Sequence, residues 1–336
     1  MKKIFSLLLL ASTVPVVAQS NINDLLSAGL NDAQRFTTAY TTPVSEALMY
    51  SMSNGWYNSG KAKPLGGFEI SIIGNMASFK NNEDKKSFEL NTADYENIQF
   101  QDGSASKIVS TALGDIQGQN IVISADVEGN TVSETITLPT GLASENINVM
   151  PSAFIQASVG LLKGTELKAR FLPKIDADGS KVGFYGVGLQ HEFTSLLPVE
   201  KIWPIAISGV IGYTHLDGAY NLQNTDAISG NNQSIDLGMD TWVFQAVVST
   251  KLPIINVYGG LGYITGKSAI NVLGTYEVSA SPLPVTYTDP FSLNNEIRGV
   301  SGNIGAKLKL GFFRLHADYT LAEFNSFSFG VNFGFR

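Results

Sequence analysis

The strongest constraint on the fold is a strict two-residue alternation at the C-terminal end of the sequence. Alternate positions carry Phe327, Phe329, Val331, Phe333 and Phe335, and the positions between them carry only Ser, Gly and Asn. Successive side chains of a β-strand point to opposite faces of the sheet. The pattern therefore predicts a strand with one aromatic, apolar face and one small, polar face.

The same alternation recurs upstream and predicts an all-β chain. We place about ten antiparallel strands, at residues 66–79, 148–162, 165–175, 181–195, 203–218, 236–252, 254–271, 294–310, 312–322 and 326–336. Residues 121–127 and 132–138 alternate as well. They predict either a hairpin outside the main sheet or further strands, so the count stays open between about 10 and 14.

Two architectures accommodate such strands, a soluble β-sandwich and a transmembrane β-barrel. The predicted strands reach about ten to sixteen residues, against about five or six in globular proteins. Very short connections alternate with long ones, as in outer-membrane barrels. The aromatic last strand, with Phe335 next to the end, resembles the C-terminal signal of outer-membrane proteins. We therefore predict a transmembrane antiparallel β-barrel.

The connections define two ends of the predicted barrel. Tight turns lie at residues 163–164, Pro253 and Gly311, whereas long links cover residues 80–147, 219–235 and 272–293. With an even number of strands, the long links and the turn at Asp178 share one end, and both termini lie at the other. Short turns face the periplasm in outer-membrane barrels, so we expect residues 80–147 to form a long extracellular loop or hairpin.

Residues 1–18 have the features of a signal peptide. Lys2 and Lys3 precede an apolar stretch at residues 4–17, and Val16 and Ala18 suit the cleavage site of a signal peptidase before Gln19. The sequence therefore predicts Sec-type export and location in the cell outer membrane.

Residues 19–65 differ from the rest of the chain because their apolar residues have helical spacing. Two helical pieces are predicted at about residues 22–40 and 43–53, with Thr42 as the N-cap of the second and Pro43 in its first turn. A break rich in Asn and Gly follows. The Leu, Phe, Tyr and Trp side chains of this segment need burial, so we expect it to plug the barrel formed by residues 66–336. The alternative is a small periplasmic cap.

Composition excludes several kinds of function. The chain has no Cys and a net charge of −7, which excludes disulfide scaffolds, Cys-ligated metal sites and a basic nucleic-acid-binding surface. The three His residues show no metal-binding spacing, and no Gly-x-Ser-x-Gly motif is present. His316 near Asp318 invites a hydrolase interpretation, but a polar lumen lining explains the pair more simply. We expect no enzymatic activity, no cofactor and no metal.

Charged and polar side chains at lumen-facing positions are the candidates for contact with a ligand or with the plug. These candidates are Glu69, Glu166, Lys168, Arg170, Lys307, Lys309, Arg314, His316, Asp318 and Arg336.

Several of these cations gather near one rim of the predicted barrel. A hairpin closed at Gly311 without a bulge would set Lys307 opposite Arg314, with Lys309 and Arg336 at the same rim. Like charges that face each other across strands are unfavourable, so we expect an acidic partner. The acids available are Glu69 on the first strand and the plug residues Asp24, Asp32 and Glu46. The alternatives are an open site for an anionic head group and side chains that only reach into periplasmic water.

Residues around the plug and the first strand also carry a resemblance. Tyr40, Pro43, residues 55–59 (GWYNS) and residues 65–68 (LGGF) resemble an uncharacterised family of predicted outer-membrane barrel proteins of the Bacteroidota type, with no assigned activity. More distantly, a helical segment before a Gly-rich first strand looks like the hatch of FadL-type transporters for hydrophobic compounds. Those transporters have fourteen strands and an Asn-Pro-Ala-type hatch motif, neither of which this chain has.

Two functions follow as hypotheses from this architecture. The first is an outer-membrane barrel, with lipid around it, that binds or passes a small hydrophobic or amphipathic compound. The second is a structural or adhesive barrel with no transport path, whose function lies in residues 80–147. A continuous cavity beside the plug would favour the first, and a lumen packed with side chains would favour the second. We expect a monomer in either case.

Overall fold

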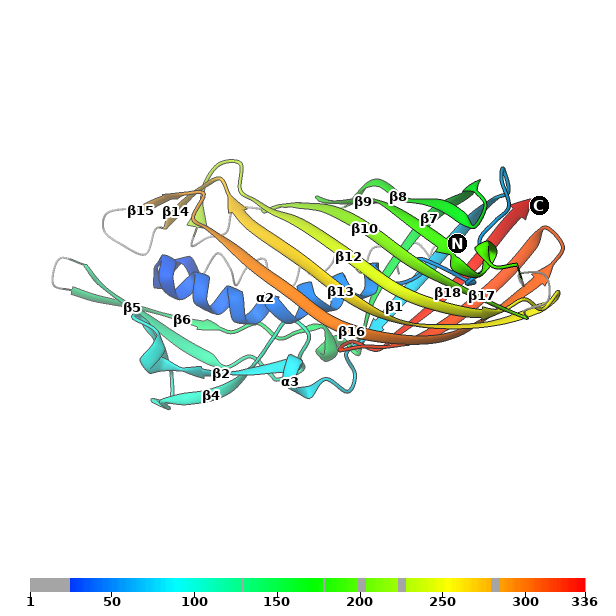
Figure 1. Ribbon diagram of the computed structural model, residues 1–336. Coiled ribbons are helices and arrows are strands. Elements are labelled where there is room, and N and C mark those ends of the chain that lie inside the picture. Colours follow the sequence, from blue (N-terminus) through cyan, green and yellow to red (C-terminus); the bar gives the residue numbers. More distant parts are fainter. Residues whose placement is uncertain are drawn as a thin grey trace.

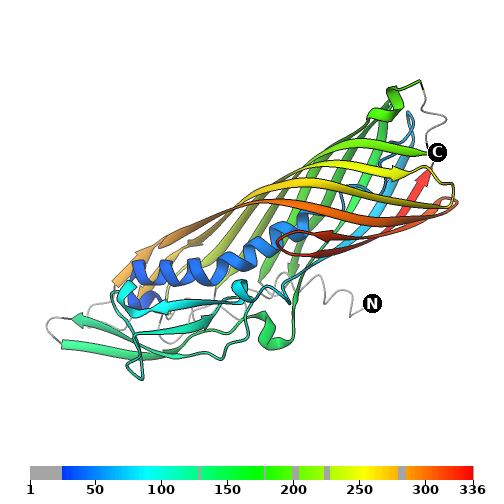
Figure 2. The same ribbon diagram turned by 60° about the horizontal axis from the view of Figure 1, so that its bottom comes forward.

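The computed structural model describes residues 25–127, 130–177, 179–198, 204–222, 228–278 and 285–335. The predicted signal peptide and the residues Asp24, Asp178 and Arg336 lie outside these ranges. The described chain forms a closed antiparallel barrel of ten strands (Figures 1 and 2), in the order β1-β18-β17-β16-β13-β12-β10-β9-β8-β7. The predicted fold class and strand number are confirmed.

The barrel strands follow the predicted ranges closely. They are β1 (Phe68–Ser78), β7 (Val149–Leu162), β8 (Thr165–Ala177), β9 (Ser180–Glu192), β10 (Ile205–Asn221), β12 (Ser234–Thr250), β13 (Ile255–Leu273), β16 (Phe291–Leu310), β17 (Phe313–Leu321) and β18 (Ser326–Phe335). Each strand pairs with its neighbour in an antiparallel register, and β1 closes the barrel between β18 and β7.

The two faces of the barrel wall have opposite chemistry. On β1 and β18 the outward side chains of Ile72 and Phe329 are exposed, whereas the inward Ser71 and Asn332 are buried. This arrangement is the inverse of a soluble protein and is the one a membrane barrel requires. The alternation in the sequence therefore separates a lipid face from a lumen face.

An aromatic band on the outer wall marks one edge of the apolar face. Tyr213 and Trp242 lie in this band, and the next outward position on β12 is the charged Asp240. From Trp242 to Thr250, where β12 ends, the strand rises about 26 Å along its axis, at about 3.3 Å per residue. A tilt of about 40° reduces this to about 20 Å, most of the apolar band of about 25 Å in outer-membrane barrels.

We distinguish the ends of the barrel by their connections. The short-turn rim holds the start of β1, the end of β18 and the tight turns between β7 and β8 and between β16 and β17. The long-loop rim holds the connections at residues 79–148, 222–233 and 274–290, together with the turn between Ala177 and Ser180. This grouping of connections is the one expected from the sequence.

Residues 80–147 form a cap at the long-loop rim (Figure 2). Its elements are α3 (Glu83–Lys86), β2 (Ser87–Asn91), η2 (Thr92–Asp94), β3 (Ile98–Phe100), β4 (Ser106–Ser110), β5 (Asn120–Val127), β6 (Asn130–Thr137) and η3 (Leu142–Glu145). They make a two-stranded sheet β2-β4 and a three-stranded sheet β3-β5-β6. The alternating residues 121–127 and 132–138 thus form a hairpin of the cap and add no strand to the barrel. A further small sheet at this rim joins β11 (Ile228–Ser229), β14 (Thr275–Val278) and β15 (Val285–Thr288).

The plug begins with η1 (Leu26–Ala28) and one helix of 24 residues, α2 (Leu30–Ser53). The prediction of two helical pieces was wrong, because Pro43 lies inside α2 and Thr42 is not an N-cap. Thr42 instead donates its hydroxyl to the Thr38 carbonyl one turn earlier, at 2.8 Å. Packing on the barrel wall and the cap on opposite sides keeps the helix continuous across Pro43. Among the described residues, no helix has the length and apolar character needed to cross a membrane.

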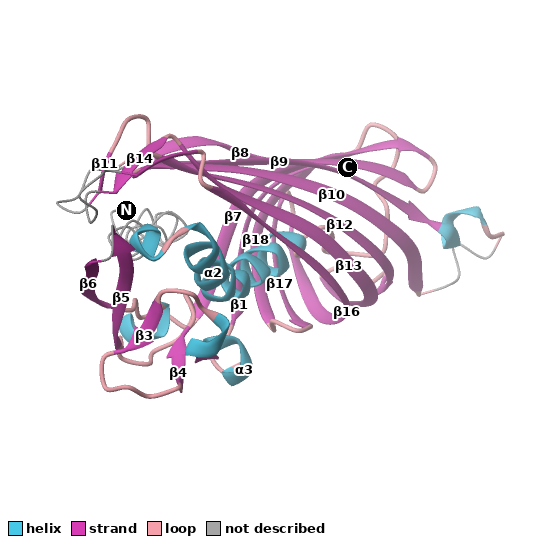
Figure 3. Cartoon of the chain, turned by 90° about the vertical axis from the view of Figure 1, so that its left-hand side faces the viewer, coloured by secondary structure: helices cyan, strands magenta, loops and turns pink. Residues whose placement is uncertain are grey.

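The barrel wall has unequal height, and α2 lies where it is low. β1, β17 and β18 have 9 to 11 residues, whereas β13 and β16 have 19 and 20. Figure 3, seen from the long-loop side, shows the outer part of α2 between the long strands and the cap. The cap therefore replaces the missing height of the wall around the helix.

Candidate functional site: the plugged lumen

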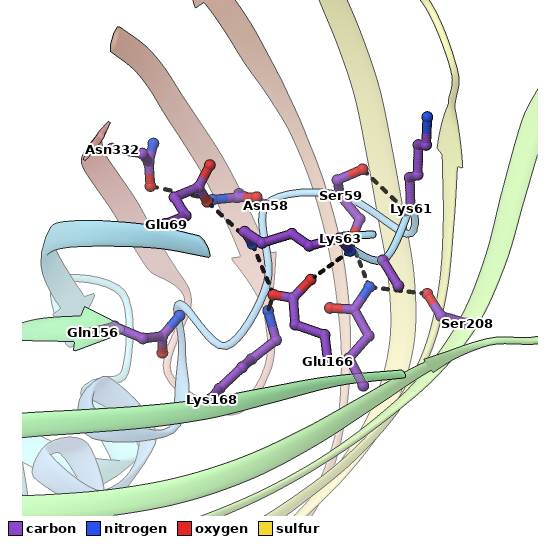
Figure 4. Close-up of polar contacts among 12 residues, drawn as sticks. Asn58, Ser59, Lys61, Lys63, Glu69, Gln156, Glu166, Lys168, Ser208 and Asn332 are labelled. Carbon is purple, nitrogen blue, oxygen red and sulfur yellow. Dashed lines mark hydrogen bonds and ion pairs between the residues drawn. The ribbon is translucent and has the colours of Figure 1, made fainter. Parts of the chain in front are cut away.

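The chain leaves α2 and crosses the short-turn half of the lumen as an extended segment, residues 54–67, which we call the extended plug segment. Gly55 follows the helix with a positive φ of 76°, a conformation that favours Gly. All residues from 54 to 60 are buried. Figure 4 shows this segment with charged and polar side chains of the surrounding wall.

The aromatic residues of the segment lie against inward-facing glycines of the wall. A Cβ atom on Gly212 would come within 2.3 Å of the Trp56 indole, and one on Gly188 within 2.6 Å. A Cβ on Gly260 would come within 2.4 Å of the Tyr57 hydroxyl. The glycines of β9, β10 and β13 therefore make room for the plug.

Wall side chains bind the backbone of the segment. The Ser208 hydroxyl donates to the Gly60 carbonyl at 2.7 Å, and the Gly60 N–H donates to the Ser249 hydroxyl at 2.9 Å. Gln190 donates its amide to the Ser59 carbonyl at 2.9 Å. These contacts satisfy main-chain groups that would otherwise be buried without partners.

Glu69 on β1 is the centre of an ionic cluster at this level. Its carboxylate lies 2.6 Å from Arg314 Nη1, 3.0 Å from Lys307 Nζ and 3.6 Å from Lys63 Nζ of the plug. Asn58 of the plug donates to Glu69 at 3.0 Å and accepts from Lys307 at 2.8 Å. The predicted acidic partner of the cations is present, and it links the wall to the plug.

The register of the last hairpins corrects one detail of the prediction. Gly311 and Phe312 both belong to the turn, so Lys309 faces Arg314 and Lys307 faces His316. The predicted pairing of Lys307 with Arg314 was wrong because it requires a turn at residues 310–311, whereas the turn lies at Gly311 and Phe312.

Glu166 and Glu192 bind the same part of the plug from β8 and β9. Glu166 lies 2.8 Å from Lys63 Nζ and 2.7 Å from Lys168 Nζ, and it also accepts the Lys63 backbone N–H. Glu192 accepts the Ala62 N–H at 3.0 Å. Together with Glu69, these carboxylates hold residues 58–63 from three strands, and Figure 4 shows Glu69 and Glu166 beside the segment.

The other predicted residues have different surroundings. His316 is buried and contacts the Asn332 amide through Nδ1, and Asp318 accepts the Tyr258 hydroxyl at 2.8 Å. Within the described residues no hydrogen bond joins His316 to Asp318, so the pair does not form a catalytic dyad in this structure. Lys309 reaches the Leu252 carbonyl at the rim.

The plug acids Asp32 and Glu46 bind the cap side of the molecule and not the cation patch. Asp32 accepts the backbone N–H groups of Glu96 and Asn97 in the cap. Glu46 lies 2.8 Å from Lys85 Nζ. Burial alone would lower the pKa of Lys85, but hydrogen bonds to Glu323 and Glu46 raise it above its usual value.

Inward side chains from all ten strands surround the extended plug segment. None is more than 6% exposed in a set with one member per strand, namely Ser71, Ser158, Lys168, Gln190, Ser208, Ser249, Asn256, Lys307, His316 and Asn332. A water-filled passage beside the plug would expose some of them. The described lumen is therefore closed at this level.

Sequence reasoning missed most of the residues that hold the plug. Trp56, Asn58 and Lys63 lie in a segment without regular periodicity, so no pattern assigned them partners. Gln190 and Ser249 could have been found, because they occupy inward positions of predicted strands. The alternation in a strand shows that a residue faces the lumen, but it does not show which plug side chain lies opposite that residue.

The architecture defines the class of protein, since a closed barrel with an apolar outer face is the fold of outer-membrane proteins. The chain belongs to a family of unknown function (DUF6588), whose model matches residues 1–335. This confirms the resemblance to an uncharacterised family. No curated protein matches the sequence.

Solved structures similar to this chain are outer-membrane barrels. Ail, the attachment invasion locus protein of Yersinia pestis, is 9% identical, with a TM-score of 0.28 and coverage of 81% of this chain and 100% of that chain. The translocator domain of autotransporter NalP from Neisseria meningitidis is 11% identical, with a TM-score of 0.29 and coverage of 90% and 98%. An outer membrane channel from Pseudomonas putida F1 is 8% identical, with a TM-score of 0.29 and coverage of 84% and 100%. The likeness concerns the barrel fold alone.

Proposed function

We propose that this protein passes a small amphipathic compound across the outer membrane through a gated lumen, and that the extended plug segment is the gate. The observation that carries the proposal is the chemistry of the contacts. Apart from Trp56 and Tyr57, residues 54–67 are held mainly by hydrogen bonds and ion pairs, whereas α2 is held largely by apolar packing against the wall and the cap.

Polar contacts are suited to an interface that has to open, such as the one between the extended plug segment and the barrel wall. A hydrogen bond between protein groups contributes a net of about 0.5–1.5 kcal/mol, because water replaces the lost partner. A large apolar side chain contributes about 1.5–3 kcal/mol when fully buried, and water offers no substitute. When the segment leaves, water reaches both surfaces, so neither the plug nor the wall keeps an unpaired buried charge.

The wall behind the segment indicates the kind of compound. Undocking would uncover Gln190, Ser208 and Ser249 together with the charged clusters around Glu69 and Glu166. A purely hydrophobic compound would leave these groups without hydrogen bonds. A compound with both polar and apolar parts can satisfy them, so the proposal favours an amphipathic compound. It includes no catalytic step and requires only a monomer in lipid.

The closed lumen supports a second candidate function. A barrel that never opens would serve as a membrane anchor that displays the cap outside the cell. The ring of buried inward side chains fits this function as well as it fits the resting state of a gate.

A double substitution that neutralises two carboxylates distinguishes the gated channel from the membrane anchor. The double variant Glu69→Gln/Glu166→Gln, in the full chain, removes the carboxylates that bind Lys63 and should loosen the gate. Glu46→Gln is the matched control, because Glu46 lies on α2 and pairs with Lys85 of the cap. Entry of small sugars, organic anions and organic cations into liposomes should rise in the double variant and stay at the wild-type rate in the control. Wild-type and variant liposomes that are equally impermeable would favour the display function.

A further inference from the structure

Arg170 is the one lumen cation of β8 whose charge has no acidic partner in the described ranges of the chain. It is 1% exposed. It donates to the Met52 carbonyl at 2.9 Å and to Gln156 Oε1 at 3.1 Å. The neighbouring Lys168 pairs with Glu166, but no ion pair is formed by Arg170 with any described carboxylate. A buried charge without a counter-ion is costly, and a fold has little reason to keep one for stability.

Two aromatic rings lie against this guanidinium. Its central carbon lies 3.5 Å from the centre of the Trp56 ring and 4.2 Å from that of Phe154. Trp56 belongs to the extended plug segment, whereas Phe154 belongs to β7. One of the two rings therefore leaves with the gate, and the other stays on the wall.

The wall beside Arg170 is hollowed by glycines. Trp56 lies over Gly188 and Gly212, and a Cβ on Gly186 would come within 2.8 Å of the Arg170 side chain. Within the described residues the buried Trp56 Nε1 has no hydrogen-bond partner. The indole thus fills the hollow as an apolar plate, without the polar contact that a permanent position would provide.

We propose that this hollow binds a small aromatic carboxylate once Trp56 moves out, an inference that rests on the proposed gate. The aromatic ring takes the place of the indole over Gly188 and Gly212. The guanidinium then turns so that its Nε and Nη2 N–H groups, which in the closed state share Gln156 Oε1, donate to the carboxylate instead, and this planar fork matches a carboxylate well. Trp56 is then the internal stand-in that closes the site when the compound is absent.

The test follows Trp56 directly, in the full-length protein in detergent. The chain has three Trp residues, so Trp203→Phe and Trp242→Phe leave Trp56 as the only indole. Benzoate is the probe, with benzyl alcohol as the neutral ring and acetate as the anion without a ring. Benzoate should raise quenching of Trp56 by acrylamide in a saturable way, and the other two compounds should not.

Substitutions on the two faces of β8 complete the test. Arg170→Gln should abolish the effect of benzoate, whereas Lys174→Gln, at an exposed outward position of the same strand, should leave it unchanged. Resistance to unfolding in detergent shows whether each variant is folded. Should Arg170→Gln fail to fold, Arg170→Lys keeps the charge but loses the planar fork, and the affinity for benzoate should fall about tenfold.

Three results would overturn the assignment: no saturable response to benzoate, an equal response to benzyl alcohol, or an unchanged response in the Arg170 variants. The measurement needs no transport. Binding of benzoate without solute entry would therefore retain the site and reject the gate, and solute entry without benzoate binding would do the reverse.

Discussion

The two halves of the plug are both buried, but they are held by different forces. In the outer half, Phe36 of α2 stacks on Tyr40 at 5.8 Å and meets Phe88 of the cap edge-on at 5.7 Å. In the extended plug segment, beyond Trp56 and Tyr57, the nearest wall groups are carboxylates, amides and hydroxyls, such as Glu166 and Ser208. Judged by burial alone, the two halves would be equally immobile. The kind of contact distinguishes them, because water can replace the polar contacts of the extended plug segment but not the apolar contacts of α2.

The barrel wall changes with the plug. Inward side chains in the long-loop half include the buried Leu216, Val243 and Ile264. Nearer the short-turn rim, the same strands carry Ser208, Ser249 and Asn256 at inward positions. Gly55 lies at the joint, between the end of α2 and Trp56. We infer that movement of the extended segment can leave α2 and the cap in place.

The largest expected effect comes from removing an apolar anchor of the fixed half. Phe36→Ala deletes a buried ring shared by α2 and the cap, and it should destabilise this part by about 3–5 kcal/mol. Hydrogen exchange should rise throughout β2 to β5 and along α2. If these elements in Phe36→Ala keep the wild-type protection against hydrogen exchange, the outer half is not held by apolar packing.

An intermediate effect is expected from filling a hollow under the extended segment. Gly212→Leu overlaps the Trp56 indole and should cost about 1–3 kcal/mol by overpacking, with a red shift of Trp56 fluorescence and faster solute entry. Gly238→Ala on β12 is the control, because nothing lies within 4 Å of its added Cβ. An unshifted Trp56 signal in Gly212→Leu would contradict the tight fit of segment to wall.

A small effect is expected from removing one of the polar contacts of the fixed half. The Tyr40 hydroxyl donates to the Thr140 carbonyl of the cap at 2.6 Å. Tyr40→Phe should cost about 1 kcal/mol of cap stability and leave solute entry unchanged. Any rise in solute entry would mean that α2 and the cap belong to the gate.

The sequence predicts the barrel well because lipid and lumen impose opposite chemistry on alternate residues. It could not place residues 121–127 and 132–138, since a cap hairpin with one buried face alternates like a barrel strand. It divided α2 at Pro43 because local rules put Pro at helix starts, whereas packing from both sides keeps the helix whole. Strand parity found Glu69, Lys307 and Arg170 as lumen residues. Their partners Asn58, Lys63 and Trp56 lie in an irregular segment, so only the folded chain brings them together.

Two engineered disulfides test the central claim that the extended segment moves while α2 stays. Ser59 and Ser249 have their hydroxyl oxygens 3.3 Å apart, and Ser51 and Ser152 have theirs 3.0 Å apart. The chain has no Cys, so each double Cys variant contains a single pair of thiols, placed where two hydroxyl groups now meet. Solute entry into liposomes should stop when Ser59→Cys/Ser249→Cys is oxidised and return on reduction, while oxidised Ser51→Cys/Ser152→Cys conducts like the wild type. Equal entry with the first cross-link open and closed, or a block by the second, would contradict the account.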